Sequence, residues 1–203
     1  SVTLSSSGKT LIVQVIAEKE KLKKYAEVIV KVGVNLKEKD GVLITANTEA
    51  LPLLREVVRA CWKVGVKDVI TDLIDHEFTL SKFEEGHDHV FDYYPEFKIN
   101  YKEELLKNNY HLISIGAPSL DLLKNIDQEK QSRAEIVEMK GWERLDQYMD
   151  SGKVKWIGAS CPTEDWAKKV FPELCEEEAV NALWEKIFEA CRINEADPVK
   201  AWE

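Results

Sequence analysis

Short apolar segments separated by turn-forming residues constrain the fold of this chain more than any other feature. Four of them have the length of strands, and each begins or ends beside turn residues: 42–44, 69–71, 112–115 and 154–157. Segments with helical periodicity lie between them. Alternation of this kind is typical of an α/β layer fold. The sequence therefore predicts a mostly parallel sheet of about four or five strands with helices on both faces.

Three segments repeat apolar residues with the period of a helix. Within residues 50–61 these share one face and place Cys61 in the core: Ala50, Leu53, Leu54, Val57, Val58 and Cys61. Residues 180–191 repeat the pattern, preceded by three glutamates at 176–178, where the helix dipole favours acids. A third helix, with Leu22 and Tyr25 on its apolar face, is expected to end near Gly33.

The remaining segments set the expected domain organisation. Residues 84–110 have weak periodicity, which predicts a long loop with one short helix. Residues 1–17 are expected to be an N-terminal extension or an extra strand. Because no repeat or Pro/Gly-rich linker divides the rest, residues 18–203 are predicted to form a single α/β domain.

Charge and cysteine content exclude several classes of protein. With 28 basic and 37 acidic residues the net charge is −9, whereas nucleic-acid binding needs clustered Lys and Arg. No segment approaches the roughly 20 apolar residues that span a bilayer. The four cysteines form no CxxC pair. We therefore expect a cytoplasmic protein in a reducing compartment, with neither nucleic acid nor membrane as a partner.

The segment Ser7-Gly8-Lys9-Thr10 resembles the end of a phosphate-binding GxxxxGKT loop. Thr3 occupies the position of the first glycine, however, and an apolar run follows where a helix should begin. An N-terminal extension is the favoured interpretation of this segment.

His87, Asp88 and His89 carry side chains that bind divalent metals. A structural zinc site needs four ligands, and the other histidines of the chain, His76 and His111, are distant in sequence. The favoured interpretation is a solvated polar loop.

Cys161 follows a predicted strand, a position where α/β enzymes often carry a nucleophile. The surrounding residues do not form a GxSxG elbow, and no histidine follows Cys161 in the chain. A packed thiol is favoured, and Thr163 is expected to cap the next helix.

The ends of the predicted strands carry small and polar residues. In open parallel sheets the carboxyl ends of the strands meet at one edge, where ligands bind. Residues 46–48, 72–76, 116–119 and 160–162 are therefore expected to surround one crevice.

Two longer motifs carry a family resemblance. Residues 156–171 read WIGASCPTEDWAKKVF and precede Pro172, and residues 197–202 read DPVKAW. Together with residues 22–46 and 115–127, they resemble the N-terminal half of the thermophilic metallo-aminopeptidases, identified as the leucyl aminopeptidase family with a two-metal site.

This resemblance implies the N-terminal domain of a longer enzyme that removes N-terminal residues from peptides. The parent enzyme would use two divalent metal ions, such as zinc or cobalt, and we expect none in this chain. No catalytic, cofactor-binding or metal-ligating residue of the family can be assigned to a position here. The expected partners are a C-terminal catalytic domain, peptide substrates and a second copy in a homodimer. The alternative is a non-catalytic small-molecule-binding or assembly module of α/β type.

Overall fold

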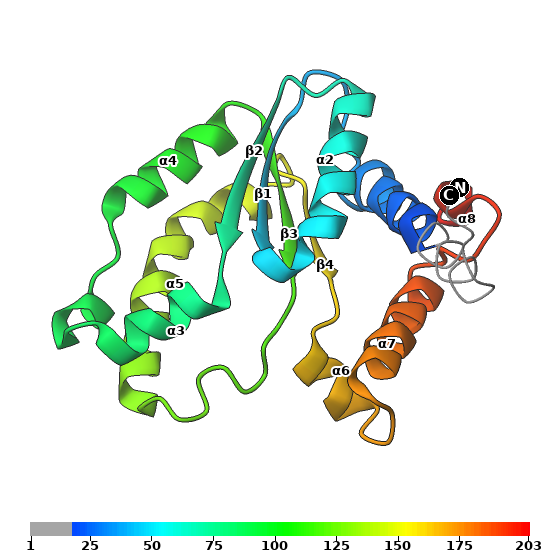
Figure 1. The fold of residues 1–203 in the computed structure, drawn as a ribbon. Helices are drawn as coiled ribbons and strands as arrows, with labels where there is room; N and C mark the ends of the chain where they lie inside the picture. Colours follow the sequence, from blue (N-terminus) through cyan, green and yellow to red (C-terminus); the bar gives the residue numbers. More distant parts are fainter. Residues whose placement is uncertain (1–17) are drawn as a thin grey trace, which may run out of the picture.

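The computed structural model describes residues 18–203 and contains a parallel sheet at its centre (Figure 1). Its strands are β1 (Gly41–Asn47), β2 (Asp68–Ile74), β3 (Tyr110–Gly116) and β4 (Trp156–Ser160). The first three include the predicted segments, whereas β4 begins two residues later than predicted. All neighbouring strands are parallel, in the order β2-β1-β3-β4. The predicted α/β fold is confirmed. The extra strand considered within residues 1–17 and the Ser7–Thr10 motif lie outside the described residues.

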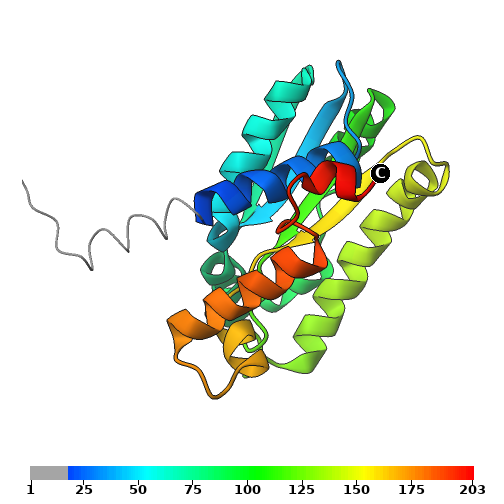
Figure 2. The ribbon, with the colours of Figure 1, turned by 90° about the vertical axis from the view of Figure 1, so that its right-hand side faces the viewer.

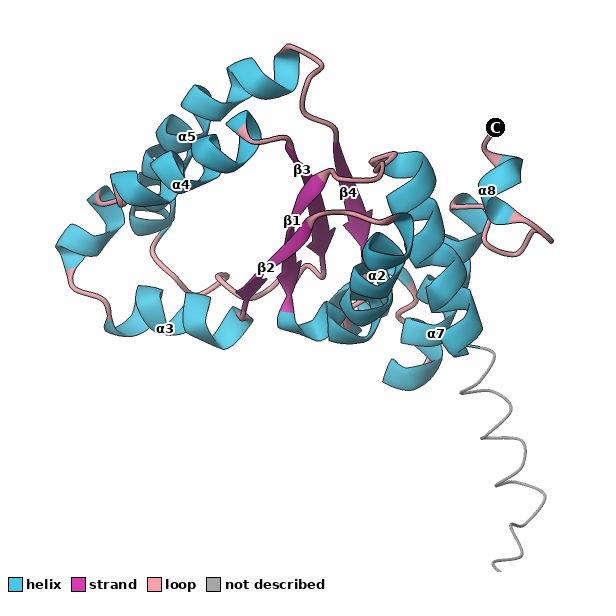
Figure 3. Ribbon diagram, turned by 90° about the horizontal axis from the view of Figure 1, so that it is seen from above, coloured by secondary structure: helices cyan, strands magenta, loops and turns pink. Residues whose placement is uncertain are grey.

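Helices lie on both sides of the sheet. One face is covered by α2 (Leu51–Val64), α7 (Glu176–Ala190) and a first helix, described from residue 18, that ends in the π-helical turn η1 (Ile29–Gly33). Figure 2 shows this first helix and α7 lying across that face. From above, α4 (Glu96–Lys107) and α5 (Gln128–Asp150) stand on the opposite side (Figure 3). The shorter elements are η2 (Thr48–Ala50), α3 (His76–Glu85), η3 (Asp88–Asp92), α6 (Glu164–Val170) and α8 (Pro198–Ala201).

The largest core lies between the sheet and the helices α2 and α7. Alternate strand residues point into it because side chains of a strand alternate between its two faces: Val42, Ile44, Ile113 and Ile115. Cys61 is fully buried in this core, as its helical periodicity predicts. A smaller core on the other face joins α4 and α5 to the starts of the strands through Ile99, Leu106, Leu145 and Val154.

The prediction of a long loop over residues 84–110 is wrong. This segment contains the end of α3, then η3 and the twelve-residue helix α4. Only Ile99, Leu105 and Leu106 of α4 are buried, while Phe97 is 69% exposed and Tyr101 is 44% exposed. Because the buried stripe is so narrow and apolar residues also face solvent, the helical period is weak in the sequence.

The first helix ends near Gly33 as predicted, but glycine is needed there for a different reason. The residue with a left-handed backbone at this end is Asn35, with φ of 47°. Gly33 instead lies against β4, where an added Cβ would overlap the Cδ1 of Ile157. The missing side chain therefore allows the helix and the edge strand to pack closely.

Candidate functional site

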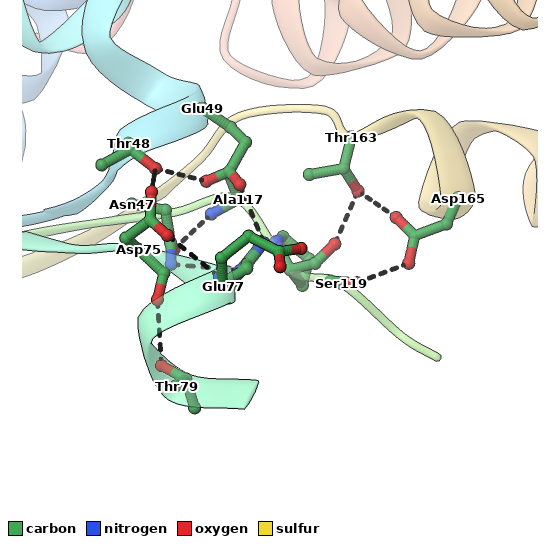
Figure 4. A network of polar contacts seen from close by, with 12 residues as sticks. Asn47, Thr48, Glu49, Asp75, Glu77, Thr79, Ala117, Ser119, Thr163 and Asp165 are labelled. Carbon is green, nitrogen blue, oxygen red and sulfur yellow. Dashed lines mark hydrogen bonds and ion pairs between the residues drawn. The ribbon is translucent and has the colours of Figure 1, made fainter. Parts of the chain in front are cut away.

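The strand order creates a crevice between the carboxyl ends of β1 and β3. The connection after β1 leads to one edge of the sheet and later connections lead to the other, so β1 and β3 flank a topological switch point. Asn47, the last residue of β1, bridges the crevice. Its Oδ1 accepts a hydrogen bond from the backbone N–H of Ala117 at 2.9 Å, and its Nδ2 lies 3.2 Å from His76 Nε2 (Figure 4).

These contacts define the state of His76. Because Asn47 Oδ1 accepts from Ala117, the Asn47 amide must present its N–H group to His76, so Nε2 of the imidazole is an acceptor. The proton then lies on Nδ1, which is 3.0 Å from Glu49 Oε1. Glu49, His76 and Asn47 thus form a continuous polar chain across the crevice.

Asp75 fixes the second side of the crevice. Its Oδ2 accepts from Thr48 Oγ1 at 2.9 Å, and its Oδ1 accepts from the N–H groups of Glu77 and Phe78, capping α3. The hydrogen bond from Thr48 is the main cause that lowers the pKa of Asp75. The carboxylate therefore ties the end of β2 to the residues after β1.

Asp165 joins the ends of β3 and β4 on the third side. Its Oδ2 accepts from Ser119 Oγ at 3.0 Å and from Leu120 N at 2.7 Å, and its Oδ1 accepts from Thr163 Oγ1 at 2.7 Å. Burial alone would raise the pKa of Asp165, but the hydrogen bonds from Thr163 and Ser119 outweigh it and the pKa is lowered. Asp165 is therefore held as a carboxylate.

Thr163 occupies the N-cap position of α6, as predicted, but its side chain does not cap the helix. The hydroxyl is close to the carbonyl oxygen of Pro118 and donates to Asp165 instead. The prediction is therefore correct for the N-cap position of Thr163 and wrong for the capping hydrogen bond.

The strand ends meet as predicted. Hydrogen bonds connect Thr48 to Asp75 and Asn47 to Ala117, and Pro162 lines a rim pocket of about 590 Å³ with Glu49, His76, Ser119 and Asp165. The rim pocket carries several carboxylates and one imidazole. Such a set can accept hydrogen bonds and attract a cation, but it contains no activated nucleophile.

Glu49 and Asp165 are the site residues that the sequence did not indicate. Each lies beside the first turn of a short helix, where an acid is expected for the helix dipole alone. Their role in connecting the strand ends depends on a partner residue that follows another strand. Asp165 and Ser119 are 46 residues apart in the sequence, so no local pattern reports that contact.

Cys161 is a packed thiol. It is 5% exposed, its Sγ lies 3.8 Å from the Pro162 carbonyl oxygen, and burial raises its pKa to about 12. Since a thiolate is the reactive form, this environment suppresses nucleophilic chemistry.

His87, Asp88 and His89 lie at the start of η3 rather than in an extended loop. The carboxylate of Asp88 pairs with Arg133 on α5 at 2.9 Å, and the two imidazole rings are stacked with centroids 6.3 Å apart. His76 is at the crevice, while His111 is buried beside Asp40 at the amino ends of the strands. The structure does not bring these side chains together.

The described residues do not fit a two-metal site. Within residues 18–203, no group of three or more His, Cys, Asp or Glu side chains is placed to hold a metal ion. Two carboxylates of the crevice, Asp75 and Asp165, are engaged by hydroxyl and N–H donors.

The comparison with protein families decides the assignment. The family described as thermophilic metalloprotease (M29) matches residues 18–203. The chain belongs to the M29 family. The predicted resemblance to thermophilic metallo-aminopeptidases is thereby confirmed, whereas its attribution to the leucyl aminopeptidase family is wrong.

Individual M29 relatives are aminopeptidases. Aminopeptidase AmpS of Bacillus subtilis is 37% identical over 183 residues, which are 90% of this chain and 45% of the relative. Aminopeptidase 2 of Geobacillus stearothermophilus is 36% identical over 91% of this chain and 45% of its own length. The chain thus spans less than half the length of these relatives.

A solved M29 structure has the same fold. Wild-type AmpT from Thermus thermophilus superposes with a TM-score of 0.80 at 25% identity, over 85% of this chain and 44% of that chain. In the part of the M29 chain that the structure describes, no helix is long and apolar enough to cross a membrane.

Proposed function

We propose that this chain is the N-terminal α/β domain of a metal-dependent aminopeptidase, which removes N-terminal residues from peptides. The observation that carries the proposal is the M29 family match over residues 18–203. The aminopeptidase relatives named above support the assignment to a single domain, because this chain corresponds to only 45% of the length of each.

In this proposal the remainder of the enzyme holds the metal ions. The family description names a metalloprotease, while the side chains of residues 18–203 form no cluster suited to a metal. Two divalent ions, such as zinc or cobalt, would polarise the scissile carbonyl and activate water. A cytoplasmic homodimer is the proposed form of the whole enzyme.

This domain is proposed to act as a scaffold that forms part of the wall of the substrate cavity. The crevice at the strand ends is the part suited to that role, since Glu49, Asp75 and Asp165 give it a negative rim. Negative potential favours the free α-ammonium group that every aminopeptidase substrate carries. The hydrogen bonds of Asn47, Thr48 and Thr163 keep this rim rigid.

The proposal is tested by the coding sequence beyond Glu203 and by its complete product. We expect a second half rich in Glu, His and Asp, and hydrolysis of peptides from the amino end. That activity should disappear on chelation and return with zinc or cobalt. A complete product without peptidase activity would contradict the proposal and favour the alternative, a non-catalytic binding or assembly module.

A further inference from the structure

The sheet has an uncovered region on its α4–α5 side. The register aligns Thr45 of β1 with Ser114 of β3, and Ser114 with Gly158 of β4, so these three residues share one face. Thr45 lines a hollow together with Tyr94 and Lys98, which places this face on the side of α4. Ser114 is exposed although β3 is paired on both edges. An added Cβ at Gly158 would meet no atom within 4 Å.

The uncovered region results from how α5 packs. The one buried residue of α5 is Leu145 in its C-terminal half, where it contacts the core near the starts of the strands. Residues 128–144 of the same helix contain no buried residue. Within residues 18–203, no layer covers the carboxyl half of this sheet face, whereas parallel sheets are ordinarily buried on both faces.

Exposed apolar side chains form one wall beside this open face. Ile74 at the end of β2 is 44% exposed, and Phe78 on α3 is 78% exposed. Tyr93, 66% exposed, continues the wall toward α4. A contiguous apolar surface on a folded chain marks an interaction site.

The wall and Thr45, at one side of the open face, border a groove between β2, α4 and α5. It consists of two adjoining hollows of about 660 and 460 Å³, which share Leu73, Ile74, Tyr94 and Lys98. Charged residues of both signs border it, with Lys98 and Lys102 on α4 and Glu135 and Glu138 on α5. A site for a small molecule encloses most of its ligand. A groove of this volume that is open to solvent matches a polypeptide segment instead.

We propose that this groove docks a segment from the metal-binding remainder of the enzyme. This inference rests on the proposed function, because it needs a polypeptide beyond the part described here. M29 relatives carry 55% of their length outside the region that matches this chain, since the match covers 45%. The small residues Thr45, Ser114 and Gly158 leave room for the segment's side chains. The apolar wall then loses its contact with water.

Cysteine labelling tests the proposal. Ser114→Cys is placed in a Cys175→Ser background, because Cys175 is the exposed native thiol among the described cysteines. In the 203-residue chain a maleimide should label the introduced thiol rapidly, since position 114 is exposed. In the complete product, labelling should be at least about ten-fold slower, as expected when a covered site reacts only after local opening. Unfolding the complete product should restore rapid labelling.

Ser151→Cys in the same background is the matched control. Ser151 is exposed in the turn after α5, away from the groove, and should react equally in both proteins. Equal rates at position 114 in both proteins would overturn the docking proposal. Protection that increases with concentration in the 203-residue chain would also overturn it, because the occupant would then be a second copy.

Peptidase activity of the same preparations separates the two proposals. An active complete product with an unprotected position 114 contradicts the docking proposal alone. An inactive complete product with a protected position 114 contradicts the aminopeptidase proposal and supports docking.

Discussion

At the scale of single residues, Asn47 connects the elements around the crevice. Its amide accepts from Ala117 N–H and donates to His76. Asn47→Ala should lower the free energy of unfolding by about 1–3 kcal/mol, because a half-buried N–H and an imidazole nitrogen lose their partner. Denaturant unfolding measures the change. Asn125→Ala, at an exposed turn position, should change stability by less than about 0.5 kcal/mol, and equal losses in both variants would contradict this role of Asn47.

A second polar network lies at the amino ends of the strands, opposite the crevice. Asp40 is 7% exposed and accepts from Lys155 Nζ at 2.9 Å and from Asn109 Nδ2 at 2.9 Å. Nδ1 of His111 accepts from the Lys155 backbone N–H, so Nε2 carries the proton toward Asp40 Oδ2 at 3.3 Å. The network therefore contains a neutral His111 and a paired carboxylate.

This network predicts a pH dependence of stability. Burial is the main cause that lowers the pKa of His111, so the unfolded chain binds a proton more readily and stability falls as the pH decreases below about 6.5. The pKa of Asp40 is also lowered, since its hydrogen bonds outweigh burial, and Asp40 stays ionised in this range. His111→Gln should reduce the loss of unfolding free energy between pH 7.5 and 5.5. An unchanged loss would show that other groups cause it.

At the scale of elements, the contact between the first helix and β4 depends on Gly33. Gly33→Ala should destabilise the protein by about 1–2 kcal/mol, because overlap with Ile157 exceeds the gain in helix propensity. In an Ile157→Val background, which lacks the overlapping Cδ1, the same substitution should cost less than about half as much. A double-mutant cycle by chemical unfolding measures the coupling. Strict additivity would contradict the account.

Arg133 attaches η3 to α5. Its guanidinium pairs with Asp88 and Asp92 and lowers the pKa of both carboxyl groups through hydrogen bonds. Arg133→Ala should accelerate hydrogen exchange in η3, and high salt should reduce the difference from the wild-type protein. Arg55→Ala, on α2, is the control that should leave exchange in η3 unchanged. Equal exchange in Arg133→Ala and the wild-type protein would contradict this role.

Local patterns predict elements whose signals are strong within one segment. The helix around Cys61 and the strand at 112–115 were predicted because apolar residues repeat with a clear period and turn residues bound them. The helix α4 was missed because its buried stripe is narrow. The segments of the crevice could be predicted from strand ends, but the bridge from Ser119 to Asp165 could not, since it depends on tertiary packing.

At the scale of the whole molecule, the alternating pattern predicts a parallel α/β fold but not the strand order. The order β2-β1-β3-β4, and with it the switch point, depends on which face each connecting helix covers. In β3 the polar Ser114 between Ile113 and Ile115 is a local sign of a half-buried strand. The extent of the open face depends instead on where α5 packs, which no single strand reports.

The central claim is that the metal ions are bound by the rest of the enzyme and not by this chain. Metal stoichiometry tests this claim most directly. The 203-residue chain and the complete product are dialysed against zinc or cobalt, and bound metal is measured by elemental analysis. We expect less than about 0.1 equivalent in this chain and about two equivalents in the complete product. Tight stoichiometric binding by the 203-residue chain, with peptide hydrolysis that chelation abolishes, would contradict the account.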